Sequence, residues 1–146
     1  MIPSEETNYA THEHWSEDGK GFYFCSDGIF YHDLATGRQT CMAKVKAAHA
    51  TMSADNRYLT FDAPVGTWFR GCAWQVGFFN RAIGKAIYLY PSLPAYNTEE
   101  NPSRLHPDPH PQFVCGDRYI ICTINHGDGR MDLSVTPVEQ LIEKTR

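Results

Sequence analysis

Two histidines and an aspartate occupy alternate positions in the proline-rich stretch "HPDPHPQF". They are His106, Asp108 and His110. Proline fixes φ and removes a backbone donor, so this stretch predicts a stiff loop rather than a helix or a central strand. Imidazole nitrogens together with a carboxylate are typical ligands of Mn²⁺, Fe²⁺ or Zn²⁺. The stretch therefore indicates either a rigid loop of metal ligands or a stiff loop with polar tips, and it leaves both interpretations open.

Three stretches of the chain share one pattern, and each begins with a histidine: His12, His49 and His110. A large apolar residue stands three places later. A polar turn follows ("SEDGK", "SADNR", "CGDR"), and then an apolar run ("GFYFC", "YLTFD", "YIICT"). Asp-Gly and similar pairs favour tight hairpin turns because they tolerate positive φ. Repeats of roughly 40 residues with four strands each are typical of β-propeller blades.

We therefore predict an all-β chain that forms one partial β-propeller domain over residues 1–146. About three four-stranded antiparallel blades should begin near residues 12, 49 and 110, with an insertion at residues 64–84 outside the regular meander. Helical spacing occurs only in the tail, "TPVEQLIEKTR", which can also be interpreted as a strand end and a frayed turn. Because propellers close with about four to eight blades, we expect either a part of a larger ring or self-association through open blade faces.

The repeat also predicts where the histidines lie. The first strand of each blade lines the channel of a propeller, so equivalent positions of successive blades lie side by side. We therefore expect His12, His49 and His110 near one another at one mouth of the channel. Alternate residues of a strand share a face, so His14 should point the same way as His12.

Composition excludes several classes of function. The net charge is −4, which argues against a nucleic-acid partner. No apolar run approaches the roughly 20 residues that a membrane span needs. The N-terminus has neither the basic nor the apolar region of a signal peptide. The five cysteines contain no C-x-x-C pair, which favours inert thiols in a reducing cytoplasm.

An aromatic segment, "GTWFRGCAWQVGFFNR", covers residues 66–81. It could be ordinary packing between strands, or a loop near the channel mouth whose rings stack on sugars. Arg70 and Arg81 in this segment could pair with carboxylates in a bidentate manner. The segment thus leaves a structural and a substrate-binding interpretation open.

Two motifs resemble the metal-site motifs of the oligogalacturonate lyase family, and they occur in the same order. They are "HEHWSEDG" at residues 12–19 and "DPHPQF" at residues 108–113. The stretch "HATMSADNRYLTFDAP" at residues 49–64 resembles the family's intervening segment, and the repeats resemble those of TolB/PD40-type propellers. The resemblance implies the C-terminal part of a seven-bladed propeller that holds a divalent cation, Mn²⁺, in its channel.

The resemblance also assigns roles to residues. The resemblance implies that His12 and His110 are metal ligands, and we expect His106 or Asp108 to complete the set. The residues that we expect to contact substrate are His14, His49 and Arg70. Asp108 replaces a histidine that is common in the family motif, and Leu105 occupies the position of the family's glutamine ligand.

The family reaction is β-elimination of pectin-derived oligogalacturonides. A base removes the proton α to the uronate carboxylate, and a cation on that carboxylate stabilises the developing enolate. The resemblance implies that the family's base lies in preceding blades, and no residue here matches it. Two functions remain: part of a lyase that acts on an anionic oligosaccharide, or a non-catalytic propeller piece that binds a ligand or a protein.

Overall fold

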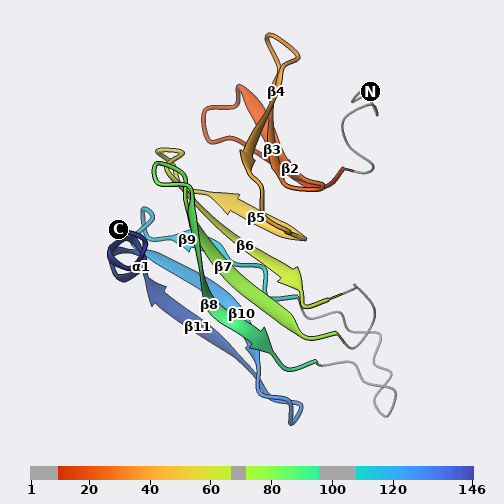
Figure 1. The fold of residues 1–146 in the computed structure, drawn as a ribbon, viewed down its shortest axis with the longest axis vertical. Coiled ribbons are helices and arrows are strands. Elements are labelled where there is room, and N and C mark those ends of the chain that lie inside the picture. The colour runs from red at the N-terminus through yellow and green to blue at the C-terminus, as the bar shows by residue number, and fades with distance from the viewer. Residues whose placement is uncertain (1–9, 67–71, 96–107) are drawn as a thin grey trace.

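The computed structural model describes residues 10–66, 72–95 and 108–146, and it contains three antiparallel sheets (Figure 1). The first sheet has the order β1 (Thr11–Trp15), β2 (Gly21–Cys25), β3 (Ile29–Asp33) and β4 (Gln39–Ala43). The second has the order β5 (His49–Met52), β6 (Tyr58–Pro64), β7 (Trp74–Asn80) and β8 (Lys85–Leu93). Both sheets are simple meanders, in which each strand pairs with the next one along the chain.

The third sheet has three described strands, with β10 at its centre. They are β9 (Gln112–Val114), β10 (Tyr119–Asn125) and β11 (Met131–Pro137), and α1 (Val138–Thr145) follows directly. Proline at position 137 suits the start of a helix because its φ of −65° is already helical and its missing N–H needs no partner. The buried side chains of α1, which include Val138 and Leu141, pack on Phe78 and Ile120.

The repeated turn motif has a clear structural basis. After β1, the backbone N–H of Ser16 donates to the Gly21 carbonyl, and the Ser16 hydroxyl accepts from the Gly21 N–H. After β5, Ser53 makes the same contacts with Tyr58. Asn56 turns the second hairpin with a φ of 58°, a region that asparagine tolerates better than most residues. The shared "S-x-D" sequence thus encodes the same hairpin in both sheets.

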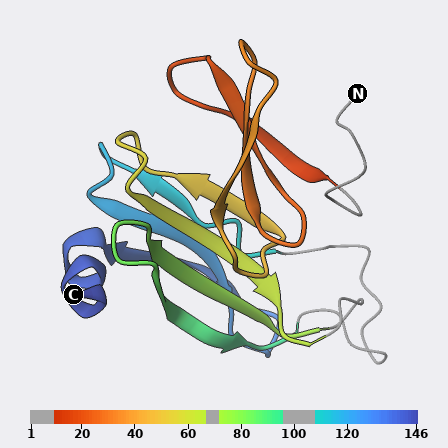
Figure 2. The same cartoon turned by 45° about the horizontal axis from the view of Figure 1, so that its top comes forward.

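The second sheet lies between the other two, and each of its faces forms a core (Figure 2). One core joins it to the first sheet through Cys25, Ile29, Leu59 and Phe61, among others. The cores on the opposite face include Trp74, Val76, Phe78, Ile120 and Cys122. The three sheets therefore form a stack of propeller-like blades that does not close.

The structure confirms the all-β class and the blade-like sheets. It differs from the expectation for residues 64–84, because Trp74–Asn80 form β7 and pair with both β6 and β8. The aromatic residues Trp74 and Phe78 of this strand belong to the cores, which favours the packing interpretation. Within the described ranges, no helix is long and apolar enough to cross a membrane.

Candidate metal centre

The first strand of the second sheet contacts the first strands of both other sheets, so β1, β5 and β9 lie together. His12 is the second residue of β1, His49 begins β5, and His110 lies two residues before β9. The ring centroids of His12 and His49 are 4.0 Å apart, and those of His49 and His110 are 3.6 Å apart. The topology therefore gathers three histidines that are far apart in the sequence.

Two of these histidines have unusual backbone conformations. The φ angles of His12 and His110 are 55° and 43°. The left-handed region is uncommon for residues other than glycine and costs of order 1–3 kcal/mol unless its surroundings impose it. The pairing of β1 with β2 is irregular between Thr11 and His14, which is where His12 departs from the strand. This backbone places the His12 ring against His49 instead of on the regular strand face.

Three side chains could hold a cation together: His49, Asp108 and His110. The Oδ2 atom of Asp108 lies 3.8 Å from His49 Nε2 and 3.9 Å from His110 Nε2. His49 and Asp108 are buried, whereas His110 is exposed, so the group opens on one side. The geometry defines a small, one-sided set of two imidazoles and one carboxylate.

The donor set fits a divalent cation. A cation about 2.0–2.2 Å from each donor can bridge two donors that are less than about 4.4 Å apart, and both measured pairs meet this limit. Neutral imidazoles and a carboxylate suit Mn²⁺, Fe²⁺ or Zn²⁺. The open side leaves room for water or for a substrate oxygen, as a catalytic rather than a structural metal site requires.

Asp62 holds the two histidines of this group in place through its carboxylate. Its side chain is 0% exposed, in the middle of β6. The backbone N–H of His49 donates to Oδ1 at 2.9 Å, and His49 Nδ1 lies 2.9 Å from the same oxygen. The backbone N–H of His110 donates to Oδ2 at 2.8 Å. One carboxylate thus fixes both histidines and, by accepting the Nδ1 proton of His49, directs its Nε2 lone pair to the cation site.

His12 lies beside the group. Its Nδ1 contacts the Thr11 hydroxyl. Partial burial lowers the pKa of His12, and the neighbouring His49 and His110 lower it further, although Asp62 and Asp108 oppose the change. The ring is therefore neutral at physiological pH and can accept a proton.

Trp74 forms an apolar wall on another side of His49. Its ring stacks on the His49 imidazole at 6.3 Å with an interplanar angle of 25°. Trp74 is buried in the core between the second and third sheets. The wall restricts the rotation of His49 and keeps water from that side of the group.

The sequence predicts that some of these residues lie close together, but it does not identify all the residues of the site. His12, His49, Asp108 and His110 lie close together as expected, but the candidate metal group contains His49, predicted to contact substrate, and does not contain His12, predicted to be a ligand. His14 stacks on Tyr23 at 5.1 Å rather than joining His12. His106 and Arg70 lie outside the described residues, and the roles assigned to them stay predictions.

Asp62 was not identified from the sequence, although a signal was present. It stands within the apolar run "YLTFDAP", where a carboxylate is costly unless it is paired. A charged residue in a strand whose sequence predicts burial on both faces indicates a polar partner on a neighbouring strand. The partner here is the histidine at the start of the neighbouring strand.

The fold and the histidine group define a propeller segment with a candidate metal site, and known structures share this fold. A structure described as an oligogalacturonate lyase in complex with manganese has a TM-score of 0.61 and 19% sequence identity, over 88% of this chain. An oligogalacturonate lyase from Vibrio parahaemolyticus has a TM-score of 0.62 and 18% identity, also over 88% of this chain.

At this identity the likeness shows the fold alone. The chain spans 35% of the length of each of these two lyases. No family model matches the sequence, and no curated protein matches it.

Proposed function

We propose that this chain is the metal-binding part of a propeller lyase that cleaves uronate-containing oligosaccharides by β-elimination. The observation that carries the proposal is the group of His49, Asp108 and His110, whose two histidines are held by the buried Asp62 carboxylate. The structural likeness to oligogalacturonate lyases, one of them in complex with manganese, supports the same assignment.

The donor group would bind the uronate end of the substrate. His49, Asp108 and His110 would hold a divalent cation, such as Mn²⁺, whose chemistry is to neutralise a bound carboxylate and stabilise the enolate that forms when the α-proton leaves. The open side next to the exposed His110 is where that carboxylate would enter. The buried Asp62 would keep the two imidazoles in place throughout.

His12 would accept the α-proton. The ring lies against His49, and its lowered pKa keeps it neutral and ready to take up a proton. In the tautomer that donates from Nδ1 to Thr11, the lone pair on Nε2 is the acceptor. This role differs from what the resemblance implied, which was a metal ligand at His12 and a base in the preceding blades.

A titration with Mn²⁺ tests the metal site directly. The wild type should bind Mn²⁺, whereas His49→Ala and His110→Ala should lose most of the affinity, and His12→Ala should keep it. His126→Ala is the matched control, because His126 is paired with Asp132 away from the site. Equal Mn²⁺ affinity in the wild type and in His110→Ala would mean that "HPDPHPQF" is only a stiff loop and does not bind metal.

The lyase reaction needs its own test. The Mn²⁺-loaded chain, alone and with the remaining blades supplied as a longer chain, is incubated with oligogalacturonides in free and in partly methyl-esterified form, and the unsaturated product is followed by ultraviolet absorbance. Activity that depends on Mn²⁺ and is lost in His12→Ala supports the proposal. A chain that binds Mn²⁺ yet forms no unsaturated product in either form would favour the non-catalytic binding function.

A further inference from the structure

A cavity lies between the first and second sheets, on the same strand, β5, that carries His49 of the candidate metal centre. Its volume is about 510 Å³, which is in the range of ligand sites, roughly 300–1,000 Å³. It is lined by β1, β5 and the turns that follow them. Thr51, on its floor, is two residues along β5 from His49, a distance of about 7 Å. The cavity therefore begins about one sugar unit away from the candidate cation site.

One wall of the cavity is aromatic. The His14 ring stacks on the Tyr23 ring with centroids 5.1 Å apart and an interplanar angle of 26°. Tyr23 is fixed from behind, because its hydroxyl donates to Asn56 Oδ1 at 2.5 Å. A rigid aromatic face suits the apolar C–H side of a sugar ring.

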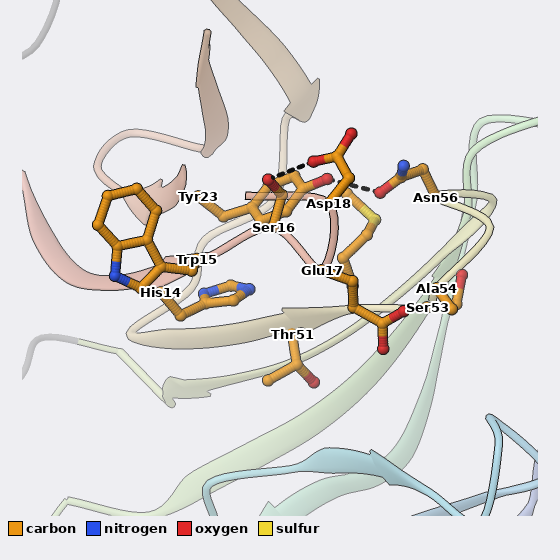
Figure 3. A pocket seen from close by; sticks show the side chains of 11 residues that line it. His14, Trp15, Ser16, Glu17, Asp18, Tyr23, Thr51, Ser53, Ala54 and Asn56 are labelled. Atoms are coloured by element: carbon orange, nitrogen blue, oxygen red, sulfur yellow. Dashed lines mark hydrogen bonds between the residues drawn. The ribbon is translucent and has the colours of Figure 1, made fainter. Parts of the chain in front are cut away.

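The other walls carry oxygen atoms that can bind hydroxyl groups. Figure 3 shows the side chain of Glu17 directed toward Ser53, with Thr51 facing His14 across the cavity. In the described part of the chain, the Glu17 carboxylate has no ion pair. Asp18, by contrast, is held by the Ser16 hydroxyl and by the ammonium group of Lys20 at 3.4 Å. Glu17 is thus the carboxylate left to accept hydrogen bonds from a ligand.

The charge of the cavity selects against a uronate. Among the residues that the structure describes, its titratable lining groups are Glu17, Asp18, His14 and Tyr23, and none of them is a lysine or an arginine. A ligand carboxylate would lie near Glu17, and like charges repel. Two cations beside the lining residues are already engaged, Lys20 by Asp18 and Arg81 by the Asn56 carbonyl. Sugar hydroxyls face no such penalty, since carboxylates and serine or threonine hydroxyls accept their hydrogen bonds.

We infer that this cavity is a subsite for an uncharged sugar unit, stacked on His14 and bound through its hydroxyls by Glu17. The link to the unit that reacts rests on the proposed function, because the cavity and the candidate metal centre share β5. The expected substrate is then a chain in which the unit next to the reacting uronate carries no free carboxylate. His14, which the sequence pattern already associated with substrate, is the central residue of the subsite.

Saturation-transfer NMR with galactose and galacturonate tests the subsite, using the full chain in excess EDTA. Galactose should receive saturation from the wild type and lose it in His14→Ala. Galacturonate should bind more weakly than galactose, and Glu17→Gln should raise its affinity about fivefold, the effect of removing one like charge at close range. Glu13→Gln is the matched control, because Glu13 is on the same strand but does not line this cavity.

The outcomes are separable from the proposed function because EDTA removes divalent cations from the measurement. If galactose receives no saturation from the wild type at millimolar concentration, the subsite does not exist, whatever the Mn²⁺ titration shows. If galacturonate and galactose bind equally to the wild type, the charge selection is wrong. Binding of galactose that His14→Ala abolishes and Glu13→Gln leaves intact supports the inference, even for a chain that fails to bind Mn²⁺.

Discussion

The carboxylate of Asp62 holds His49 at two points, through its backbone N–H and through Nδ1, both 2.9 Å from the same oxygen. The second oxygen accepts the N–H of His110 at 2.8 Å. A residue of the second strand of a blade therefore fixes two candidate metal ligands that are 61 positions apart in the sequence. Such carboxylate–histidine contacts orient metal ligands and raise their basicity.

Replacing Asp62 should weaken metal binding without removing any ligand. The two carboxylate oxygens of Asp62 now accept hydrogen bonds from three N–H groups. An asparagine has only one acceptor oxygen, so at least one of these groups loses its partner. Asp62→Asn should lower Mn²⁺ affinity about 10- to 100-fold and destabilise the fold by about 1–3 kcal/mol. Titration calorimetry and urea unfolding measure the two effects. Asp55→Asn is the control, since Asp55 pairs with Arg57 in an exposed turn; an unchanged Mn²⁺ affinity in Asp62→Asn would contradict the assignment.

The sequence predicts the blades well because hairpin turns and alternating strands are local signals. The turns at Ser16 and Ser53 have the contacts that the repeated motif implies. The sequence does not predict β7. Trp74 and Phe78 belong to this strand, which is buried on both sides, and the aromatic composition of the strand resembles that of a loop insertion. The sequence also predicts that His12, His49 and His110 meet, since the repeat register carries that information. It does not predict the left-handed backbone of His12, which depends on the irregular pairing with β2.

Gly77 should be intolerant of a side chain. A Cβ at this position would lie 2.3–2.8 Å from three ring atoms of Phe61, which is fully buried. Gly77→Ala should therefore destabilise the chain by about 1–3 kcal/mol, as overpacking of cores does. Urea unfolding measures the change. The double variant Gly77→Ala/Phe61→Leu should recover part of the loss, because the two residues are in contact; simple additivity of the two single effects would refute the proposed clash.

Acid should destabilise the chain partly through His14. The pKa of His14 is lowered from its ordinary value of 6.5 because burial disfavours the charged form. The folded state then binds fewer protons than the unfolded state, so the free energy of unfolding rises with pH. The stabilisation that neutral His14 contributes is complete above pH 6.5 and is lost as the pH falls through the lower pKa that His14 has in the folded state. His14→Phe should flatten the dependence of unfolding free energy on pH in this window, as urea titrations across it would show. A His14→Phe profile parallel to that of the wild type would mean that other groups cause the acid sensitivity.

The cysteines should separate into two classes of reactivity. Cys41 and Cys115 are exposed, whereas Cys25, Cys72 and Cys122 are buried. Burial raises the pKa of Cys25 to about 12 and that of Cys122 to about 11, so neither forms the reactive thiolate at neutral pH. A thiol reagent should modify the two exposed cysteines quickly in the native chain and all five only after unfolding in urea. Rapid modification of Cys25 in the folded chain would show that the core between the first two sheets opens easily.

Both ends of the stack of sheets expose apolar side chains, which should make the isolated chain associate. On β11, Leu133 and Val135 are 66% and 58% exposed on the same strand face. At the other end, Trp15 is 67% exposed and packs edge-on against Phe22. An uncovered sheet face and an unpaired edge strand favour self-association.

Sedimentation should therefore depend on concentration in the micromolar range, and Leu133→Lys/Val135→Lys should shift the chain toward the monomer by placing charges on the apolar face. Ile83→Lys is the matched control, because Ile83 is 52% exposed but lies in the turn between β7 and β8. If the wild type sediments as a stable monomer at all these concentrations, the exposed face of β11 is tolerated in water and does not drive association.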